Sequence, residues 1–203
     1  CLLVVAHFGS TEVLRFAPVE QSTSATRATH IRTTILLDRQ HGRMLMQLLE
    51  RLNPEMALDI VDASVRGPQL VLKLKEALQA GHTVCVMADR VATDEGFVTV
   101  DFLGGRARFA ESPWLLAAAL RVPVILGFGL YLRGDRYSAH FELFADRVDL
   151  PRENRQQALN QLAQRYARRL EHYVHVAPYN WFNFYEYWLS ERAATSTHAA
   201  SAD

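Results

Sequence analysis

His7 and Glu12 are the first residues in the chain whose types and spacing could perform chemistry. They are the ends of "HFGSTE", which follows an apolar run. A histidine can act as a general base near neutral pH. A carboxylate can fix its tautomer and stabilise the imidazolium that forms. Gly9 would permit the chain reversal that returns Glu12 to the imidazole. The alternative is that His7 is a hydrogen-bonded structural residue at a strand end, and that Glu12 favours the start of a helix.

The elements that must position these residues are predicted from hydrophobic periodicity. Strands are expected at 1–6, 33–37, 56–63, 83–90, 97–102, 105–109, 122–132 and 137–144. Helices are expected from about Thr11 and at 38–52, 67–80, 112–120 and 151–173. Strands and helices alternate through most of the chain. This alternation predicts a single α/β layered domain with a largely parallel central sheet flanked by helices.

A charged pair, Asp89-Arg90, ends the buried run "TVCVMADR". Ligand sites of parallel α/β sheets lie at the carboxyl ends of the strands. His7 also follows a strand in this interpretation. We therefore expect His7 and Asp89-Arg90 at the same edge of the sheet.

Composition excludes several classes of function. The 203 residues carry 22 basic and 22 acidic side chains, so net charge gives no reason to expect a nucleic-acid partner. The two cysteines cannot form a disulfide framework. His82 and Cys85 have a spacing that metal ligands can have, but they lie in a predicted buried strand, so no metal site is expected. The apolar stretch 113–132 is long enough to span a membrane. Arg121 and Pro123 within it favour a helix followed by a strand instead.

Four segments in series resemble the lysophospholipid acyltransferase superfamily. The resemblance is to its bacterial branch related to the lipid A late (lauroyl and myristoyl) acyltransferases, and it covers about residues 2–188. "HFGSTE" fits the His-x4-Asp/Glu signature, and "VCVMADRV" resembles that branch's strand ending in Asp-Arg. The third and fourth segments are "VDFLGGRARFAESPWLLAAALRVPVILGF" and "YARRLEHYVHVAPYNWFNFYEYW".

The resemblance implies transfer of a fatty acyl group from a thioester to a hydroxyl or amine of a lipid or glycolipid. The donor would be acyl carrier protein or coenzyme A, with no other cofactor. His7 would take the acceptor's proton, and Glu12 would hold and polarise His7. Backbone N–H groups around Gly9 and Ser10, or an arginine, would stabilise the oxyanion.

The resemblance also suggests roles for four further residues. Asp89 and Arg90 would bind the acceptor or support the His7 loop; the alternative is a structural ion pair or a strand-end cap. Arg106 and Arg108 could bind a phosphate on the acceptor or on the donor's pantetheine arm. The alternative is that these two arginines are solvent-facing.

The aromatic ending has two interpretations. Its large rings could dock at a membrane interface or pack in the core of their own domain, and we expect packing. These rings are Trp181, Phe182, Phe184, Tyr185, Tyr187 and Trp188. Trp114 is expected in the core as well.

The domain is expected to span residues 1–190, with a disordered tail at 191–203. The chain begins with Cys1 rather than methionine, so we expect an N-terminally truncated sequence. The resemblance places the protein at the cytoplasmic face of a bacterial inner membrane, peripheral or anchored through the missing region. Two other functions fit the residues, namely a non-catalytic domain that binds acyl carrier protein or lipid, and a thioesterase in which water replaces the acceptor.

Overall fold

A computed structural model describes residues 1–16, 32–37, 60–65, 67–92 and 95–189. Two sequence predictions lie outside these residues: the helix at 38–52 and the disordered tail at 191–203. The side chain of Glu12 is also outside the described part.

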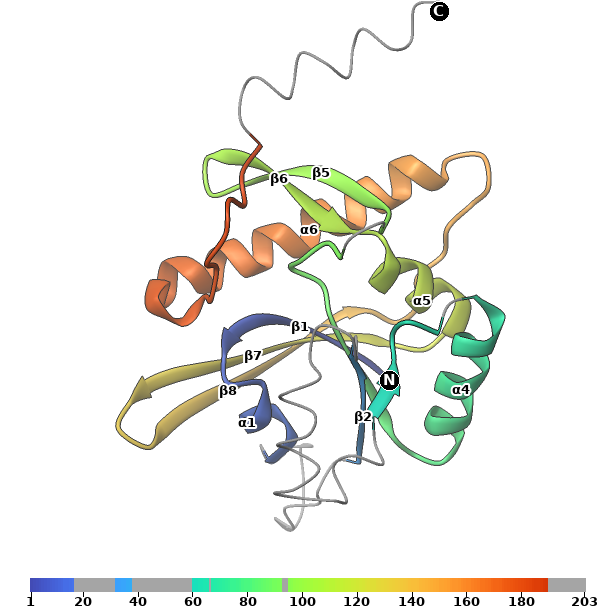
Figure 1. Ribbon diagram of the computed structural model, residues 1–203, viewed down its shortest axis with the longest axis horizontal. Helices are drawn as coiled ribbons and strands as arrows, with labels where there is room; N and C mark the ends of the chain where they lie inside the picture. The colour runs from blue at the N-terminus through green and yellow to red at the C-terminus, as the bar shows by residue number, and fades with distance from the viewer. Residues whose placement is uncertain (17–31, 38–59, 66, 93–94, 190–203) are drawn as a thin grey trace, which may run out of the picture.

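The centre of the fold is a six-stranded, largely parallel sheet in the order β3-β2-β4-β1-β7-β8 (Figure 1). All neighbouring strands are parallel except β7 and β8, which form an antiparallel hairpin. The strands of the six-stranded sheet are β1 (Leu2–Gly9), β2 (Thr33–Leu37), β3 (Ile60–Asp62), β4 (Thr83–Met87), β7 (Val124–Arg133) and β8 (Arg136–Ala145). The predicted α/β class is confirmed.

A long helix separates this sheet from a second, two-stranded sheet. Helix α6 (Arg155–Val176) packs on strand β5 (Phe97–Phe102), which pairs with β6 (Gly105–Ala110). Figure 1 shows α6 between the β5–β6 hairpin and the large sheet. The other helices in the described ranges are α1 (Thr11–Phe16), α4 (Pro68–Gln79), α5 (Ser112–Leu120) and the short 3-10 turn η1 (Pro178–Asn180).

Alternation along β1 explains how both faces of the sheet are covered. Even-numbered residues Leu2 to Phe8 join the large core cluster that includes Tyr166 and Leu170 of α6. Leu3 and Val5 face the other way and pack with Leu14 of α1. A strand buried on both faces reads as a continuous apolar run, which is what the sequence shows.

Most of the predicted elements that the structure describes have the expected bounds to within two residues, and three differ by more. β4 ends at Met87 rather than at residue 90, and the Asp89 carboxylate beyond it accepts the His7 N–H. β1 runs on to Gly9 rather than ending at residue 6, because Gly9 still pairs with Gly129 of β7. The last helix begins at Arg155 rather than Pro151, since the exposed residues 151–154 form a turn and Leu159 is the first buried side chain of α6.

The apolar stretch 113–132 forms a helix and then a strand, as predicted. Arg121 ends α5 with a left-handed φ of 57°, and β7 begins at Val124. Within the described ranges, no helix is long and apolar enough to cross a membrane.

Candidate functional site

Strand register places His7 opposite Asp89. β1 and β4 are parallel neighbours in which Val5 pairs with Met87, and the Ala88 N–H donates to the Val5 carbonyl oxygen at 3.0 Å. Two residues beyond this pair, the chain reaches His7 on β1 and Asp89 in the bend that follows β4. The expectation that both lie at one edge of the sheet is met.

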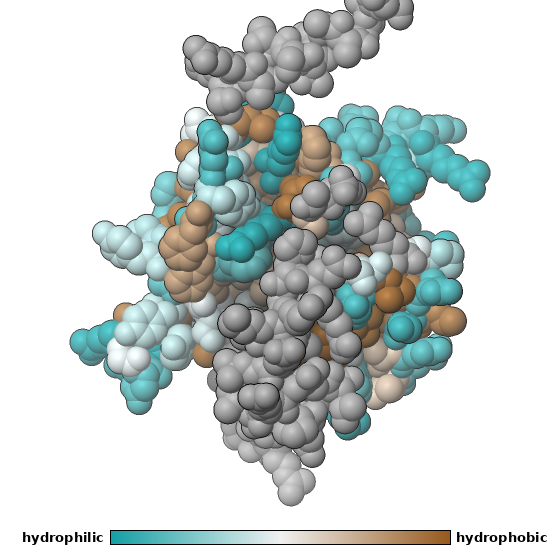
Figure 2. All heavy atoms as spheres, viewed as in Figure 1, coloured by the Kyte–Doolittle hydropathy of each residue, from teal (hydrophilic) through white to brown (hydrophobic). Residues whose placement is uncertain are grey.

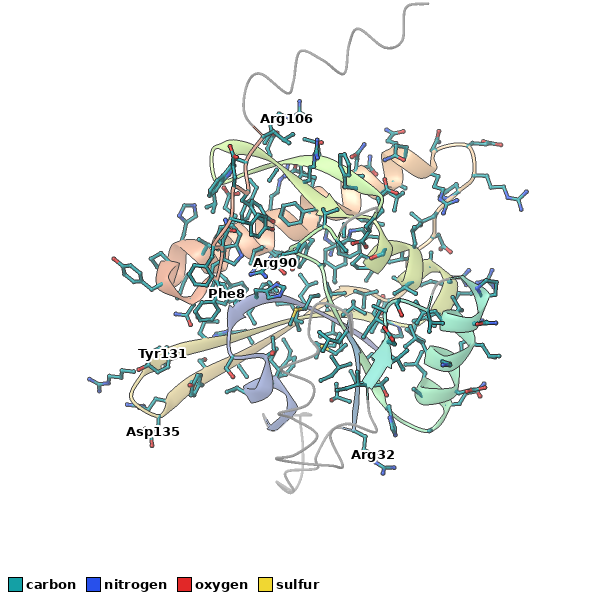
Figure 3. The ribbon with its side chains drawn as sticks, in the orientation of Figure 1. Phe8, Arg32, Arg90, Arg106, Tyr131 and Asp135 are labelled. Atoms are coloured by element: carbon teal, nitrogen blue, oxygen red, sulfur yellow. The ribbon has the colours of Figure 1, made fainter. Side chains whose placement is uncertain are left out.

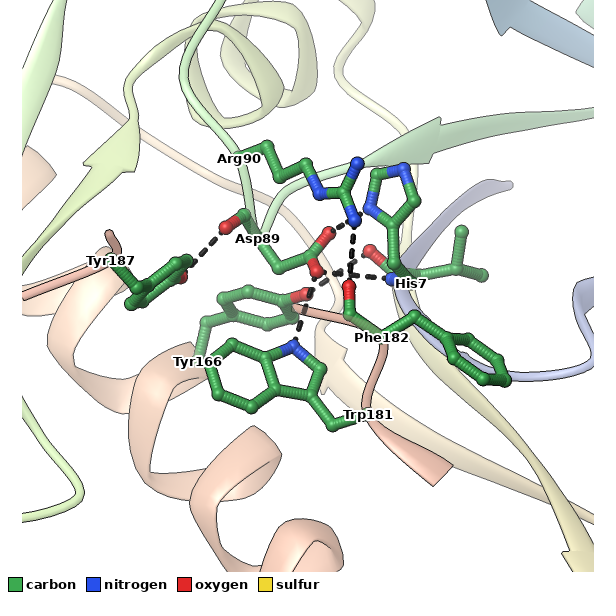
Figure 4. Close-up of polar contacts among 8 residues, drawn as sticks. His7, Asp89, Arg90, Tyr166, Trp181, Phe182 and Tyr187 are labelled. Carbon is green, nitrogen blue, oxygen red and sulfur yellow. Dashed lines mark hydrogen bonds and ion pairs between the residues drawn. The ribbon is translucent and has the colours of Figure 1, made fainter. Parts of the chain in front are cut away.

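The Asp89 carboxylate binds His7 at two points. Its Oδ1 lies 2.8 Å from His7 Nδ1, and its Oδ2 accepts the His7 backbone N–H at 3.1 Å (Figure 4). Asp89 is 1% exposed, whereas 28% of the His7 side chain is exposed. A carboxylate beside Nδ1 favours the tautomer of the neutral imidazole that carries its proton on Nδ1. The lone pair on Nε2 is then free to accept a proton. This is the arrangement that a general base requires.

A C-terminal strap, residues 177–189, supplies further donors to Asp89. The Trp181 indole Nε1–H points at Asp89 Oδ2 at 3.4 Å, and the Tyr187 hydroxyl donates to the Asp89 carbonyl oxygen at 2.6 Å. Buried carboxylates need such partners, because an unpaired charge loses its hydration. The strap therefore fixes the position of Asp89, and Asp89 in turn orients His7.

The strap is itself joined to the site. The Phe182 N–H donates to the His7 carbonyl oxygen at 2.8 Å, and Phe8 forms a β-bridge with Trp181. Arg90 donates from Nη2 to the Phe182 carbonyl oxygen at 2.6 Å. Residues from the start, the middle and the end of the chain thus meet around one imidazole.

Two tyrosines beside Asp89 are held neutral. Burial, and secondly the charge of Asp89, raise the pKa of the Tyr166 hydroxyl and that of Tyr187 well above the ordinary value. Tyr166 donates to the Val5 carbonyl oxygen at 3.0 Å. Both hydroxyls therefore remain donors throughout the range in which a histidine titrates.

Gly9 and Ser10 form the turn that leaves the site. Gly9 has a φ of +58°, and a Cβ there would collide with the Gly129 carbonyl oxygen. The Ser10 N–H donates to that same oxygen at 2.8 Å. The Ser10 N–H thus already has a backbone partner, and the role of N–H groups around Gly9 and Ser10 at an oxyanion stays a prediction.

Arg90 is at the site, whereas Arg106 and Arg108 are not brought to His7. The Arg90 guanidinium also lies 5.5 Å from the centre of the Tyr185 ring. Arg106 and Arg108 are exposed on β6, and Figure 3 shows Arg106 at the outer edge of the β5–β6 hairpin, away from Arg90. Arg108 stacks over Phe97 at 4.3 Å and lines an open cavity of about 480 Å³ with the end of the strap.

The structure divides the aromatic ending into two groups. Tyr187 is buried, and Trp181 packs on Phe102 with ring centres 5.2 Å apart. Phe184 is 87% exposed, and Phe182 and Tyr185 are also exposed. The expectation of core packing is confirmed for Trp181, Tyr187 and the buried Trp114. It is wrong for Phe182, Phe184 and Tyr185, because the irregular strap turns one side to the core and one side outward. Trp188 is 38% exposed but still contacts the Tyr187 ring.

The sequence pointed to Glu12 as the partner of His7 and left the role of Asp89 open. Glu12 lies in the first turn of α1, and a contact between its side chain and His7 stays a prediction. The contact that the structure gives is with Asp89, 82 residues away in the chain. The signal for it was the strand-end position of both residues; the support from Trp181 and Tyr187 had no comparable signal.

The chain matches the model of a known protein family. The family model described as bacterial lipid A biosynthesis acyltransferase matches residues 1–190. No curated protein sequence matches the chain.

Proposed function

The chain belongs to the bacterial lipid A biosynthesis acyltransferase family, and we propose that it moves a fatty acyl group from a thioester to a hydroxyl or amine of a lipid or glycolipid, with His7 as the general base. Membership supports acyl transfer as the reaction class. The observation that carries the role of His7 is the 2.8 Å contact between its Nδ1 and Asp89 Oδ1.

The proposed reaction is direct transfer. The acceptor's oxygen or nitrogen attacks the thioester carbonyl carbon while His7 Nε2 takes its proton. The tetrahedral intermediate then collapses, the carbon–sulfur bond breaks, and the imidazolium returns the proton to the leaving thiolate. The products are an acylated lipid and a free thiol, so no serine or cysteine nucleophile is needed.

Asp89 stabilises the imidazolium that forms during this step. Its carboxylate is buried, lies against Nδ1 and accepts the His7 backbone N–H, so ring and backbone are fixed together. Preorganised charge of this kind lowers the barrier without reorganisation at the moment of reaction. We assign Asp89 the role of positioning residue, and Glu12 remains a second candidate for that role.

The negative charge that develops on the oxyanion requires a hydrogen-bond donor near His7. Arg90 is the arginine of the site, and Figure 4 shows its guanidinium on the same side of Asp89 as the His7 ring. It uses one N–H on the Phe182 carbonyl oxygen, and a guanidinium has five. We propose that Arg90 faces the oxyanion or an acidic group of a substrate, together with the backbone of Gly9.

We propose acyl carrier protein or coenzyme A as the donor, with the thioester as the only cofactor-like group. Both carriers present a phosphate on a pantetheine arm. Arg108 lines the cavity that the last residues of the strap also line, and its guanidinium could bind this phosphate. A location at the cytoplasmic face of the bacterial inner membrane is part of the same proposal, and the family resemblance supports it.

The test compares wild type with His7→Ala, Asp89→Asn and Glu12→Gln. Each protein receives labelled acyl-carrier-protein or acyl-coenzyme A and an extract of bacterial lipids, and mass spectrometry quantifies newly acylated lipid. We expect His7→Ala to lose about 10²- to 10⁴-fold, and Asp89→Asn up to roughly 10⁴-fold with a changed pH profile. Circular dichroism checks that each variant is folded.

Each outcome bears on one part of the proposal. Equal product from wild type and His7→Ala would make His7 structural and the proposed mechanism wrong. A loss with Glu12→Gln but none with Asp89→Asn would transfer the positioning role to Glu12. Free fatty acid in place of acylated lipid would indicate a thioesterase, and no turnover of any donor would indicate a binding domain.

A further inference from the structure

Large apolar side chains are exposed on one side of the molecule. Tyr179 is 95% exposed and Phe184 is 87% exposed, and other large side chains around them are more than two-fifths exposed. We call this set the interfacial patch: Tyr131, Leu132, Tyr137, Val176, Tyr179, Phe182 and Phe184, with Arg133 and Arg136. Clusters of exposed apolar surface on soluble proteins mark interaction sites.

The patch is continuous across the fold. A hollow of about 440 Å³ is lined on one side by the tip of the β7–β8 hairpin and on the other by residues 176–180. Asn180 bonds the Tyr131 backbone on both sides, with its Oδ1 accepting the N–H at 2.6 Å and its Nδ2 donating to the carbonyl oxygen at 3.2 Å. Figure 1 shows the hairpin tip, the end of α6 and the strap along the same side of the molecule. Figure 2 shows pale and tan side chains exposed beside teal ones on that side.

Its composition fits the interface of a lipid bilayer. Tyrosine and phenylalanine beside arginine are the side chains that occupy the headgroup region, because one end is apolar and the other is polar or charged. Arg133 and Arg136 stand at the hairpin tip with only Asp135 between them as an acid. On a chain with zero formal net charge, this local excess of cations favours an anionic surface.

The patch adjoins the His7 site. Phe182 belongs to it and donates its backbone N–H to the His7 carbonyl oxygen at 2.8 Å. A surface that touched the patch would therefore bring its own lipids beside the imidazole.

We propose that the interfacial patch docks this protein on an anionic lipid bilayer, with the Tyr179 and Phe184 rings among the headgroups and Arg133 and Arg136 against lipid phosphates. The inference rests on the proposed function only in requiring that the acceptor is a lipid. Other occupants, such as a second copy of the chain or a carrier protein, are outcomes of the test below.

The experiment measures flotation of the chain with vesicles of phosphatidylcholine, with or without phosphatidylglycerol, and without any acyl donor. We expect binding that is stronger on the anionic vesicles. The double variant Tyr179→Ser/Phe184→Ser should weaken binding to both by about tenfold or more. Arg133→Glu/Arg136→Glu should weaken binding to the anionic vesicles by about tenfold and hardly affect the neutral ones.

Matched controls alter equally exposed residues elsewhere. Leu72→Ser/Leu143→Ser removes side chains that are 60% and 61% exposed on α4 and at the far end of β8. Arg152→Glu/Arg155→Glu reverses two exposed charges at the other end of α6.

The proposal is overturned if wild type does not float, or if the control pairs lose as much binding as the patch pairs. It is also overturned if the patch variants instead abolish a dimer seen by sedimentation. Because no donor is present, a failed transfer assay leaves this result unaffected.

Discussion

At the scale of the residue, Gly9 shows how backbone conformation and close packing act together. Its φ of +58° is unfavourable for an L-residue, and a Cβ would also meet the Gly129 carbonyl oxygen. Gly134 has nearly the same φ, +57°, but nothing lies within 4 Å of its virtual Cβ. We expect Gly134→Ala to lower the free energy of unfolding by about 1 kcal/mol, and Gly9→Ala by at least about twice as much.

Urea denaturation of the two variants measures this difference. Equal losses would mean that the strand β7 moves away from Gly9 without cost. That result would contradict the close approach of β1 and β7 at the His7 turn.

At the scale of the element, Glu142 ties β8 to α6. Its carboxylate accepts from Arg169 at 2.6 and 2.8 Å and from the Tyr173 hydroxyl at 2.7 Å. The Arg169 hydrogen bond lowers the pKa of Glu142 from its usual 4.5, although partial burial opposes this, and burial raises the pKa of Tyr173 to about 12. A carboxyl whose pKa is lower in the folded state contributes stability above its unfolded pKa and loses it as pH falls toward the folded value.

We therefore expect Glu142→Gln to lower the free energy of unfolding by about 1 kcal/mol at pH 7, a modest figure because solvent screens these partly exposed groups. The difference from wild type should shrink as pH falls below 4.5. Asp149→Asn, at the exposed Arg147 pair, is the control and should change little. A gap between wild type and Glu142→Gln that stays constant down to pH 3 would refute the lowered pKa.

At the scale of the whole molecule, the C-terminal strap closes both the core and the site. Trp181 and Tyr187 pack on Phe102, and the Trp188 indole N–H donates to the Phe102 carbonyl oxygen at 2.9 Å. The strap thereby joins the small sheet to the end of β1. Removing the strap would expose the Phe102 ring, which Trp181 and Tyr187 now cover, and would withdraw two hydrogen-bond donors from Asp89.

We expect a chain ending at Ala177 to melt at a much lower temperature than one ending at Leu189, or to fail to fold. The single variant Tyr187→Phe keeps the packing and loses one hydrogen bond, so it should cost about 1 kcal/mol. Thermal unfolding followed by circular dichroism makes the comparison. Equal melting temperatures for the two truncated chains would show that the strap is an appendage.

The sequence by itself determined the elements and the family. The buried strand at the start of the chain, the bounds of β2 and α5, and the change from helix to strand at Arg121 were all predicted, because hydrophobic periodicity and proline act over a few residues. The strand-end position of Asp89 was predicted for the same reason. Four motifs in series pointed to the acyltransferase family that the whole-chain match shows.

Only the tertiary structure decided which carboxylate the described site gives to His7. Strand order and register bring Asp89 to Nδ1 across 82 residues, and no local pattern encodes which two strands become neighbours. The same holds for the strap, where tertiary packing buried Tyr187 and left Phe184 in solvent within three residues. Periodicity cannot separate such neighbours in an irregular segment, because the face that each side chain presents there is set by contacts with distant parts of the chain.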